Sequence, residues 1–390
     1  MSAIHLLIAL ETRYAFDREV FLSIASAAQA YGELYLHHPS HPEMSLTDAA
    51  AQTHARGMII SRSGPRDVEE VAALRVPAIN VANYLEGHAH VPVVGNDDVA
   101  IGETIAEYYL DRGFRHFAYI ADANVAYFHP RRDGFLLTLA RAGFSCGVGP
   151  PPRASHVREG RNEPGYEERL GDWLRTLPLP LAVMCPFDLY AVETVHACRL
   201  AGLRVPEQVS IMGVDDDPLV CTSATPQISS VRTAATRVGA VALEQLLHRI
   251  DGGRPPARPT LFPPEGIAAR RSTVEVAIHD PDVAAAVSFI RTHLRQRLTV
   301  DNISDHLAIS RRTLERKFVA AMGRTPLDEI RRARIALAKQ LLIGTDFSLA
   351  EVARRSGMLR QQRLSNLMRV ECGLTPTEFR EKYRSEPMLS

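Results

Sequence analysis

The first two thirds of the chain alternate short apolar runs with amphipathic segments. The apolar runs predict buried strands at residues 5–10, 34–37, 57–61, 78–82, 91–95, 117–121, 181–185 and 209–215. Between them, apolar residues recur at helical spacing over residues 19–31, 99–112, 130–142, 166–174 and 189–201. Strands that alternate with helices are typical of βαβ units, whose parallel sheets are covered on both faces. We therefore predict an α/β domain over residues 1–272.

The C-terminal part carries a helical pattern that occurs twice. One copy begins at Leu298 and ends with GRTP, and the other begins at Phe347 and ends with GLTP. Each copy predicts a short helix, a tight turn and a second helix, which is the helix-turn-helix pattern. The matching apolar positions, 49 or 50 residues apart, are Ile303 and Val352, Leu314 and Leu364, and Phe318 and Met368. We predict an all-α domain with two helix-turn-helix units over residues 283–390.

A longer helix is predicted between the two copies. Its apolar stripe consists of Ile330, Ile335, Leu337, Ala338, Leu341 and Leu342. A helix of this length spans roughly 25 Å, at about 1.5 Å per residue. With the width of the flanking units added, the two second helices come near the roughly 34 Å between successive major grooves on one face of DNA. One rigid module could therefore read two grooves.

The outer faces of the two second helices are basic and polar. Arginine and glutamine can form bidentate pairs with guanine and adenine edges in the major groove. The alternative is a basic helix face that only contacts solvent. The candidate DNA-binding residues are Arg311, Arg312, Thr313 and Arg316 in the first copy, and Arg360, Gln361, Gln362 and Arg363 in the second.

The net charge of zero conceals an asymmetry. Of the 45 basic and 45 acidic residues, 20 and 11 lie from Val283 onwards, which leaves 25 and 34 before it. The C-terminal domain thus has a basic excess, as expected of a surface that binds phosphates. The acidic excess of the residues before Val283 limits non-specific binding of the whole molecule to DNA.

Several classes of site lack support in the sequence. The five cysteines are scattered and include no C-x-x-C pair, so neither a zinc site nor a disulfide framework is expected. No G-x-G-x-x-G or Walker A motif follows a strand, and no catalytic constellation has an interpretable spacing, so we expect no nucleotide cofactor and no metal. The opening apolar run is too short for a membrane span and lacks a basic flank. We expect a cytoplasmic protein without a membrane partner.

Polar residues follow several predicted strands, where ligands of parallel sheets bind. They include the Asp97 and Asp215 carboxylates and the Arg131 guanidinium at a helix start. Carboxylates together with an arginine suit a polyhydroxylated ligand, because each hydroxyl can both donate and accept. Asp97 and Asp188 could instead be helix N-caps, and for Asp188 we favour the cap.

The C-terminal residues resemble the AraC/XylS-type DNA-binding domain. The resemblance rests on RARIALAKQLL in the long helix, on Gly357 and on the closing G-x-TP-x-EFR. It implies that Arg312, Arg316, Gln361 and Gln362 face DNA bases. The second copy departs from the family pattern in two places: Asn366 stands where arginine is often found, and Met368 replaces the usual phenylalanine.

The α/β domain resembles the LacI-type sugar-binding domain, itself similar to periplasmic sugar-binding proteins. The phrases VVGNDDVAIGETIAEYYLDRGFRHFAYI, RRDGF and VPEQVSIMGVDDDPL carry this resemblance. It implies two α/β lobes with a hinge and a sugar between them. The ligand-binding residues that it implies are Phe16, Asp17, Asp97, Arg131, Phe187 and Asp215. Phe187 stands where many relatives have asparagine, and its ring could stack on the apolar face of a pyranose.

The order of the two domains, joined by a linker over residues 273–282, resembles the xylose operon regulators of bacteria. This resemblance implies a transcription activator that binds double-stranded DNA and D-xylose as a homodimer, with RNA polymerase as a further candidate partner. Closure of the lobes around the sugar would reposition two DNA-binding modules on repeated half-sites. The alternatives are another sugar or sugar acid, a DNA-binding protein that needs no ligand, and an enzyme that modifies a sugar.

Overall fold

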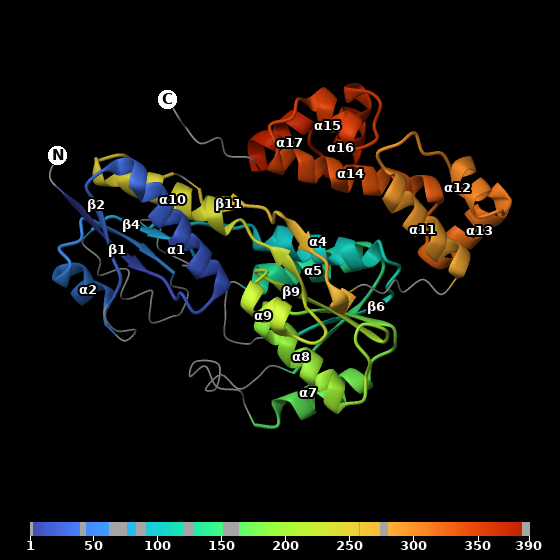
Figure 1. Ribbon diagram of the computed structural model, residues 1–390, viewed down its shortest axis with the longest axis horizontal. Helices are drawn as coiled ribbons and strands as arrows, with labels where there is room; N and C mark the ends of the chain where they lie inside the picture. The colour runs from blue at the N-terminus through green and yellow to red at the C-terminus, as the bar shows by residue number, and fades with distance from the viewer. Residues whose placement is uncertain are drawn as a thin grey trace. The chain divides into compact units, whose positions relative to one another are not determined.

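The computed structural model consists of two compact units, which are Met1–Ala106 with His116–Val274, and Glu107–Arg115 with Glu275–Ser390. The described residues are 3–39, 44–61, 76–82, 91–120, 128–150, 164–256, 258–273 and 280–383. The first unit contains mainly parallel sheets with helices, and the described part of the second contains helices only (Figure 1). The predicted fold class is therefore confirmed. Residues 274–279 of the predicted linker lie outside the described part.

The first sheet has the strand order β2-β1-β3-β4, with every neighbouring pair parallel. Its strands are β1 Ile4–Ala9, β2 Leu34–His37, β3 Gly57–Ile60 and β4 Ala78–Asn80. Leu6 and Ile8 pack with helices α1 (Ala15–Ala28) and α10 (Ala235–Ile250), which lie side by side across the strands (Figure 1). Leu7 and Ala9 pack instead with α2 (Leu46–Gln52). Successive side chains of β1 thus point to opposite faces of the sheet, and both faces are buried.

The second sheet has the order β12-β10-β9-β8-β6-β7, and only the β10–β12 pair is antiparallel. Its strands are β6 His116–Tyr119, β7 Cys146–Val148, β8 Leu181–Met184, β9 Val209–Val214, β10 Ser229–Arg232 and β12 Gly266–Ala268. A separate two-stranded sheet pairs β5 (Val94–Asn96) with β11 (Thr260–Phe262).

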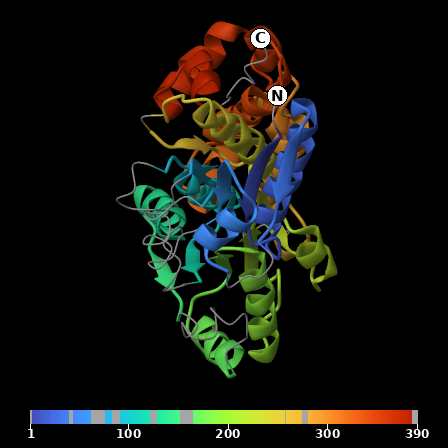
Figure 2. The same ribbon diagram turned by 90° about the vertical axis from the view of Figure 1, so that its left-hand side faces the viewer.

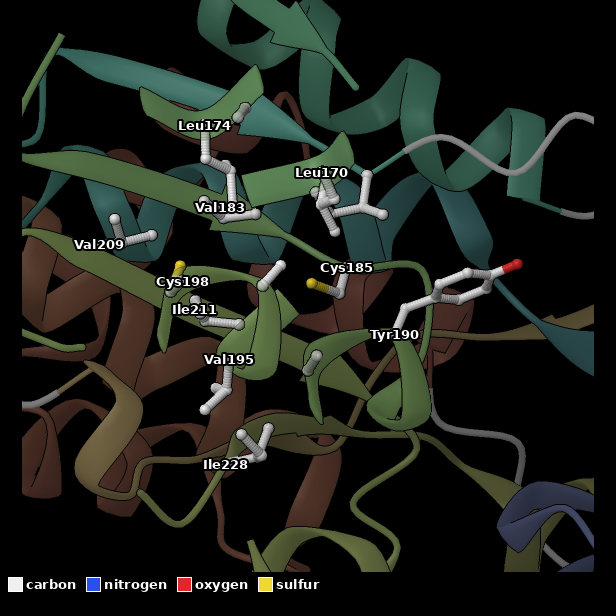
Figure 3. Close-up of a cluster of buried hydrophobic side chains, with 14 of the residues drawn as sticks. Leu170, Leu174, Val183, Cys185, Tyr190, Val195, Cys198, Val209, Ile211 and Ile228 are labelled. Carbon is white, nitrogen blue, oxygen red and sulfur yellow. The ribbon is translucent and has the colours of Figure 1, made fainter. Parts of the chain in front are cut away.

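Figure 3 shows the core on one side of the second sheet. Side chains from β8 and β9, such as Val183 and Ile211, interdigitate there with Leu170 and Leu174 of α7 (Tyr166–Arg175). Val195 and Cys198 of α8 (Asp188–Leu200) complete this layer. Helix α8 is thereby fixed against the strands, so that its N-terminus stands at their carboxyl ends.

The second unit repeats the same helices, as the sequence predicts. Its helices are α11 Pro281–His293, α12 Val300–His306, α13 Arg311–Met322, α14 Pro326–Gly344, α15 Leu349–Arg355, α16 Gln361–Cys372 and α17 Pro376–Tyr383. In Figure 2 the red part of the chain, from α14 to α17, consists of helices and loops. Helices α13 and α16 both end at a left-handed glycine, Gly323 and Gly373, 50 residues apart. The predicted duplication is therefore confirmed.

Helix α14 belongs to the cores of both helix-turn-helix units. Ile330 packs in the first core with Leu314 and Phe318, all nearly fully buried. Ile335 and Leu342, further along the same helix, pack in the second core, where α16 contributes its own apolar side chains. At about 1.5 Å per residue, the 19 residues of α14 span about 28 Å. A single helix therefore fixes the spacing of the two units.

Candidate ligand site and nucleic-acid interface

Charged side chains gather at the carboxyl ends of the parallel strands of the first unit. Asp17 lies in the first turn of α1, which follows β1, and Asp215 follows β9 directly. Arg131 lies in α5 (Phe128–Arg141), and Asp98 and Asp188 each begin a helix. These five residues are called the strand-end cluster below.

Arg131 and Asp98 form the most buried ion pair of the described residues, with side chains 4% and 3% exposed. The guanidinium donates from Nε at 2.9 Å and from Nη2 at 2.6 Å to Asp98 Oδ1. It also donates from Nη1 to the carbonyl O of Pro186, in the loop after β8. The arginine predicted from sequence is thus anchored from two sides, and Asp98 is a partner that the sequence did not identify.

Close packing of α4 (Asp98–Leu110) on α5 brings this pair together. A Cβ at Gly102 would lie 2.0 Å from the carbonyl O of Arg131, and one at Gly134 would lie 2.2 Å from that of Val99. Both distances are far below van der Waals contact. The two glycines therefore allow a helix crossing that a larger residue at either position would prevent.

Three consecutive aspartates after β9 form a strained turn. Asp215 has φ 99° and Asp216 has φ 55°, values that cost a non-glycine residue free energy. The Asp216 N–H donates to Ser230 Oγ at 2.9 Å, and the Asp217 N–H donates to Asp188 Oδ2 at 2.8 Å. These hydrogen bonds hold the turn in place.

The N-cap predicted for Asp188 is wrong. Phe187 is the N-cap residue of α8, and the Asp188 carboxylate instead accepts from Asp217 N–H and, at 2.5 Å, from Ser230 Oγ. Burial is the main cause that raises the Asp188 pKa to about 8, and the nearby Asp215 charge raises it further. Asp188 thus supports the aspartate turn through tertiary contacts.

Asp17 interacts electrostatically with Asp215, and Asp215 interacts with Arg131. Burial raises the pKa of each to about 6. The Arg131 charge lowers the Asp215 pKa, whereas Asp98 raises it; Asp17 accepts from the Glu11 N–H at 2.7 Å. The structure therefore brings together three of the six ligand residues predicted from sequence.

The other three predicted ligand residues lie in more ordinary surroundings. Phe16 packs partly against the core beneath α1. Asp97 accepts from the Ala100 N–H at 3.0 Å in the first turn of α4, as an N-cap does. Phe187 is partly buried, and its ring lies edge-on to two others, with centroid distances of 6.2 Å to Tyr14 and 4.7 Å to Tyr190. Their contact with a ligand stays a prediction.

One ion pair joins the elements of the two sheets. Arg18 of α1 donates from Nη2 to Asp217 Oδ2 at 3.0 Å, while Asp217 Oδ1 caps α9 (Pro218–Ser223) by accepting from Leu219 N–H at 2.9 Å. No local pattern predicts this pair, because the partners are 199 residues apart. Together with the Tyr14–Phe187 ring contact, it connects the first sheet's elements to those of the second.

Arg312 and Arg316 are exposed on α13, and no ion pair involves them in the described part of the chain. Arg311 is exposed as well, but its guanidinium pairs with Glu315 at 2.9 Å and with Asp301 at 3.3 Å. The Thr313 hydroxyl bonds to the Ser310 Oγ, which caps the helix. Of the four candidates in the first helix-turn-helix unit, Arg312 and Arg316 are thus the two arginines whose side chains have no ion pair among the described residues.

In the second helix-turn-helix unit, all four candidates are exposed at the start of α16; they are Arg360, Gln361, Gln362 and Arg363. Gln362 Nε2 donates to Asn366 Oδ1 at 3.1 Å, which pre-orients its amide. Met368 is fully buried, as Phe318 is in the first helix-turn-helix unit, so this departure from the family pattern leaves the core filled. All eight predicted DNA-binding side chains therefore lie on the two second helices or at their N-caps.

Two family models match the chain. One, described as a periplasmic binding protein-like domain, matches residues 106–273. The other, described as a helix-turn-helix domain, matches residues 303–382. Both resemblances inferred from the sequence are thereby confirmed. None of the helices in the described ranges is long and apolar enough to cross a membrane.

Relatives of known function match nearly the whole chain. A xylose operon regulatory protein of Haemophilus influenzae is 26% identical over 371 residues, which cover 94% of this chain and 95% of that protein. One from Escherichia coli K12 is 26% identical over 388 residues, 96% of each. The solved structure of the xylose-binding transcription activator XylR is 23% identical, with a TM-score of 0.61, and covers 99% of this chain and 100% of its own. A cellobiose complex of the regulator CelR covers 70% of this chain and 84% of its own, at 20% identity and a TM-score of 0.56.

Proposed function

We propose that this chain, a sugar-responsive DNA-binding transcription regulator with a periplasmic-binding-protein-like domain before an AraC-type helix-turn-helix domain, takes D-xylose as its effector. The observation that carries the proposal is the near-complete coverage of two xylose operon regulatory proteins, which extends over both units. With such relatives the chain is a regulator and not an enzyme.

The strand-end cluster supplies what a pentose needs. Asp17 and Asp215 can accept hydrogen bonds from sugar hydroxyls, and Arg131 can donate to hydroxyl or ring oxygens. The partly buried Phe187 ring offers an apolar surface for the C–H face of the sugar ring. We place the sugar among these four side chains, with Asp188 supporting Asp215 from behind.

Sugar binding would act on the contacts that join the two sheets' elements. The Arg18–Asp217 ion pair connects α1 to the N-cap of α9, and the Tyr14–Phe187 ring contact connects the N-cap of α1 to that of α8. A ligand shifts a conformational equilibrium only by its differential affinity for the two states. A sugar held by Asp17 and Asp215 together favours the state in which these contacts form.

On the DNA side, we propose that α13 and α16 each read one major groove. Arg312 and Arg316 would contact bases from α13, and Gln361 and Gln362 from α16. Two copies of the chain on repeated half-sites, contact with RNA polymerase and a cytoplasmic location complete the proposal. They follow from the same domain order as the relatives.

The first experiment is thermal unfolding of the purified chain against D-xylose, L-arabinose, D-ribose, cellobiose and sugar acids. A true effector at about one hundred times its Kd adds roughly 2.7 kcal/mol to the unit that it binds. We expect the shift with D-xylose, and expect Arg131→Ala to abolish it. Its neighbour on α5 provides a matched control, since Arg132 pairs with the exposed Asp133 and Arg132→Ala should keep the shift. A shift with a different sugar alone would replace D-xylose as the effector, and no shift at all would favour a regulator that needs no ligand.

A further inference from the structure

The loop before the first helix-turn-helix unit, Leu294–Arg297, packs on the turn of the second. A Cβ added to Gly357, the turn residue between α15 and α16, would lie 1.9 Å from the carbonyl O of Leu294. Arg334 of α14 donates from Nη2 to the carbonyl O of Gln296 at 3.0 Å. These backbone contacts fix the loop, called the arginine loop below, beside the N-terminus of the second reading helix.

The arginine loop lies in a positively charged environment. Arg295 and Arg297 are exposed, and Arg360 and Arg363 stand at the start of α16 next to the turn on which the loop packs. Burial is the main cause that lowers the Arg334 pKa, and the nearby Arg363 charge lowers it further. Arg334 is 7% exposed, and its Nε has no hydrogen-bond partner within the described ranges.

Several basic side chains elsewhere in this unit are paired with carboxylates. Arg331 pairs with Asp328 at 3.3 Å, Arg354 with Glu351 at 2.5 Å, and Lys317 with Asp282 at 2.5 Å. In contrast, neither Arg295 nor Arg297 has an ion pair within residues 280–383. Like charges gathered without a carboxylate repel one another, unless an external anion neutralises them.

We infer that Arg295 and Arg297 bind DNA backbone phosphates between the two reading helices, as a contact that is independent of base sequence. The inference extends the DNA-binding function to residues outside both reading helices. The loop lies beside the start of α16, so a duplex backbone that runs between α13 and α16 in successive grooves would pass within reach of it. Arginine suits this role because its planar guanidinium pairs bidentately with phosphate.

The test is the salt dependence of binding to a random-sequence DNA duplex, measured by fluorescence anisotropy between about 50 and 200 mM salt. Each phosphate contact contributes about 0.9 to the slope of log K against log salt. The double variant Arg295→Gln with Arg297→Gln should make the slope shallower by about 1.8 and weaken binding roughly 30-fold at about 0.15 M salt. The double variant Arg295→Lys with Arg297→Lys should retain most of the slope and most of the affinity.

The matched control is the double variant Arg331→Gln with Arg354→Gln, which removes two arginines that are already paired and should leave the slope unchanged. The loop is held by its backbone, so the glutamine variants should keep the unfolding temperature of the helical unit. A glutamine double variant with the wild-type slope and affinity would overturn the inference. A loss of affinity on some duplex sequences only, with the slope unchanged, would also overturn it, because that result marks base contacts.

Discussion

Gly357 allows a direct test of how tightly the two helix-turn-helix units are joined. It has φ 74°, and Gly373 has the nearly identical φ of 69°, but a Cβ at Gly373 would meet no atom within 4 Å. Gly373→Ala therefore costs only the left-handed backbone, about 1–2 kcal/mol. Gly357→Ala must in addition push away the Leu294 carbonyl and leave the buried Arg334 without its acceptor, which adds about 1–3 kcal/mol. We expect a total loss of roughly 2–5 kcal/mol at Gly357.

Scanning calorimetry of the full chain measures this difference, because each kcal/mol lowers the Tm of a domain of this size by about 4–8 °C. Trp173, the single tryptophan, lies in the first unit, so its fluorescence should report an unchanged transition in both variants. The helical unit should melt clearly lower in Gly357→Ala than in Gly373→Ala. Equal losses in the two variants would refute the close packing of Leu294 on the turn.

Four further substitutions test the two sites. Asp98→Ala leaves the Arg131 charge buried and unpaired, so urea unfolding should show a loss of about 3–5 kcal/mol; a loss below 1 kcal/mol would contradict the buried pair. Because the Asp188 pKa is about 8 in the folded chain against 3.8 for an unperturbed aspartate, the folded chain retains a proton that the unfolded chain has lost. Stability should therefore fall as pH rises between these values, by up to about 1.4 kcal/mol per unit, and Asp188→Asn should remove this slope from unfolding measured at several pH values. Arg312→Ala should relax base preference in a DNA selection at a cost of about 1–3 kcal/mol, whereas Arg311→Ala, whose guanidinium is paired with carboxylates, should leave the preference unchanged.

The architecture was largely predictable because its main signals are local. All eight apolar runs appear as strands, and the duplicated helices recur at the predicted offset. Strand β10 was missed since Ser229 and Ser230 look like loop residues. Both are fully buried, and Ser229 gains its partners from Ser272 and Arg270, some 40 residues away. Buried polar strands of this kind carry no periodic apolar pattern.

The ligand site was predictable only in part, for a related reason. Asp215 directly follows a strand and Arg131 lies near the start of a helix, positions that the sequence reveals. The pairing of Asp98 with Arg131 spans 33 residues, and that of Asp188 with Asp217 spans 29. An aspartate at a helix start is commonly an N-cap, and only the tertiary fold shows that Asp188 bonds to the neighbouring turn instead. Local patterns therefore located the strand ends but not the hydrogen bonds that organise them.

We propose that D-xylose controls a module that reads two successive grooves of DNA. Selection of bound duplexes from a random-sequence library, with and without D-xylose, tests it most directly. We predict enriched sites made of two short elements whose centres lie roughly 10 base pairs apart, with stronger enrichment in the presence of the sugar. Enrichment of a single short element, or the same enrichment with and without D-xylose, would contradict the account.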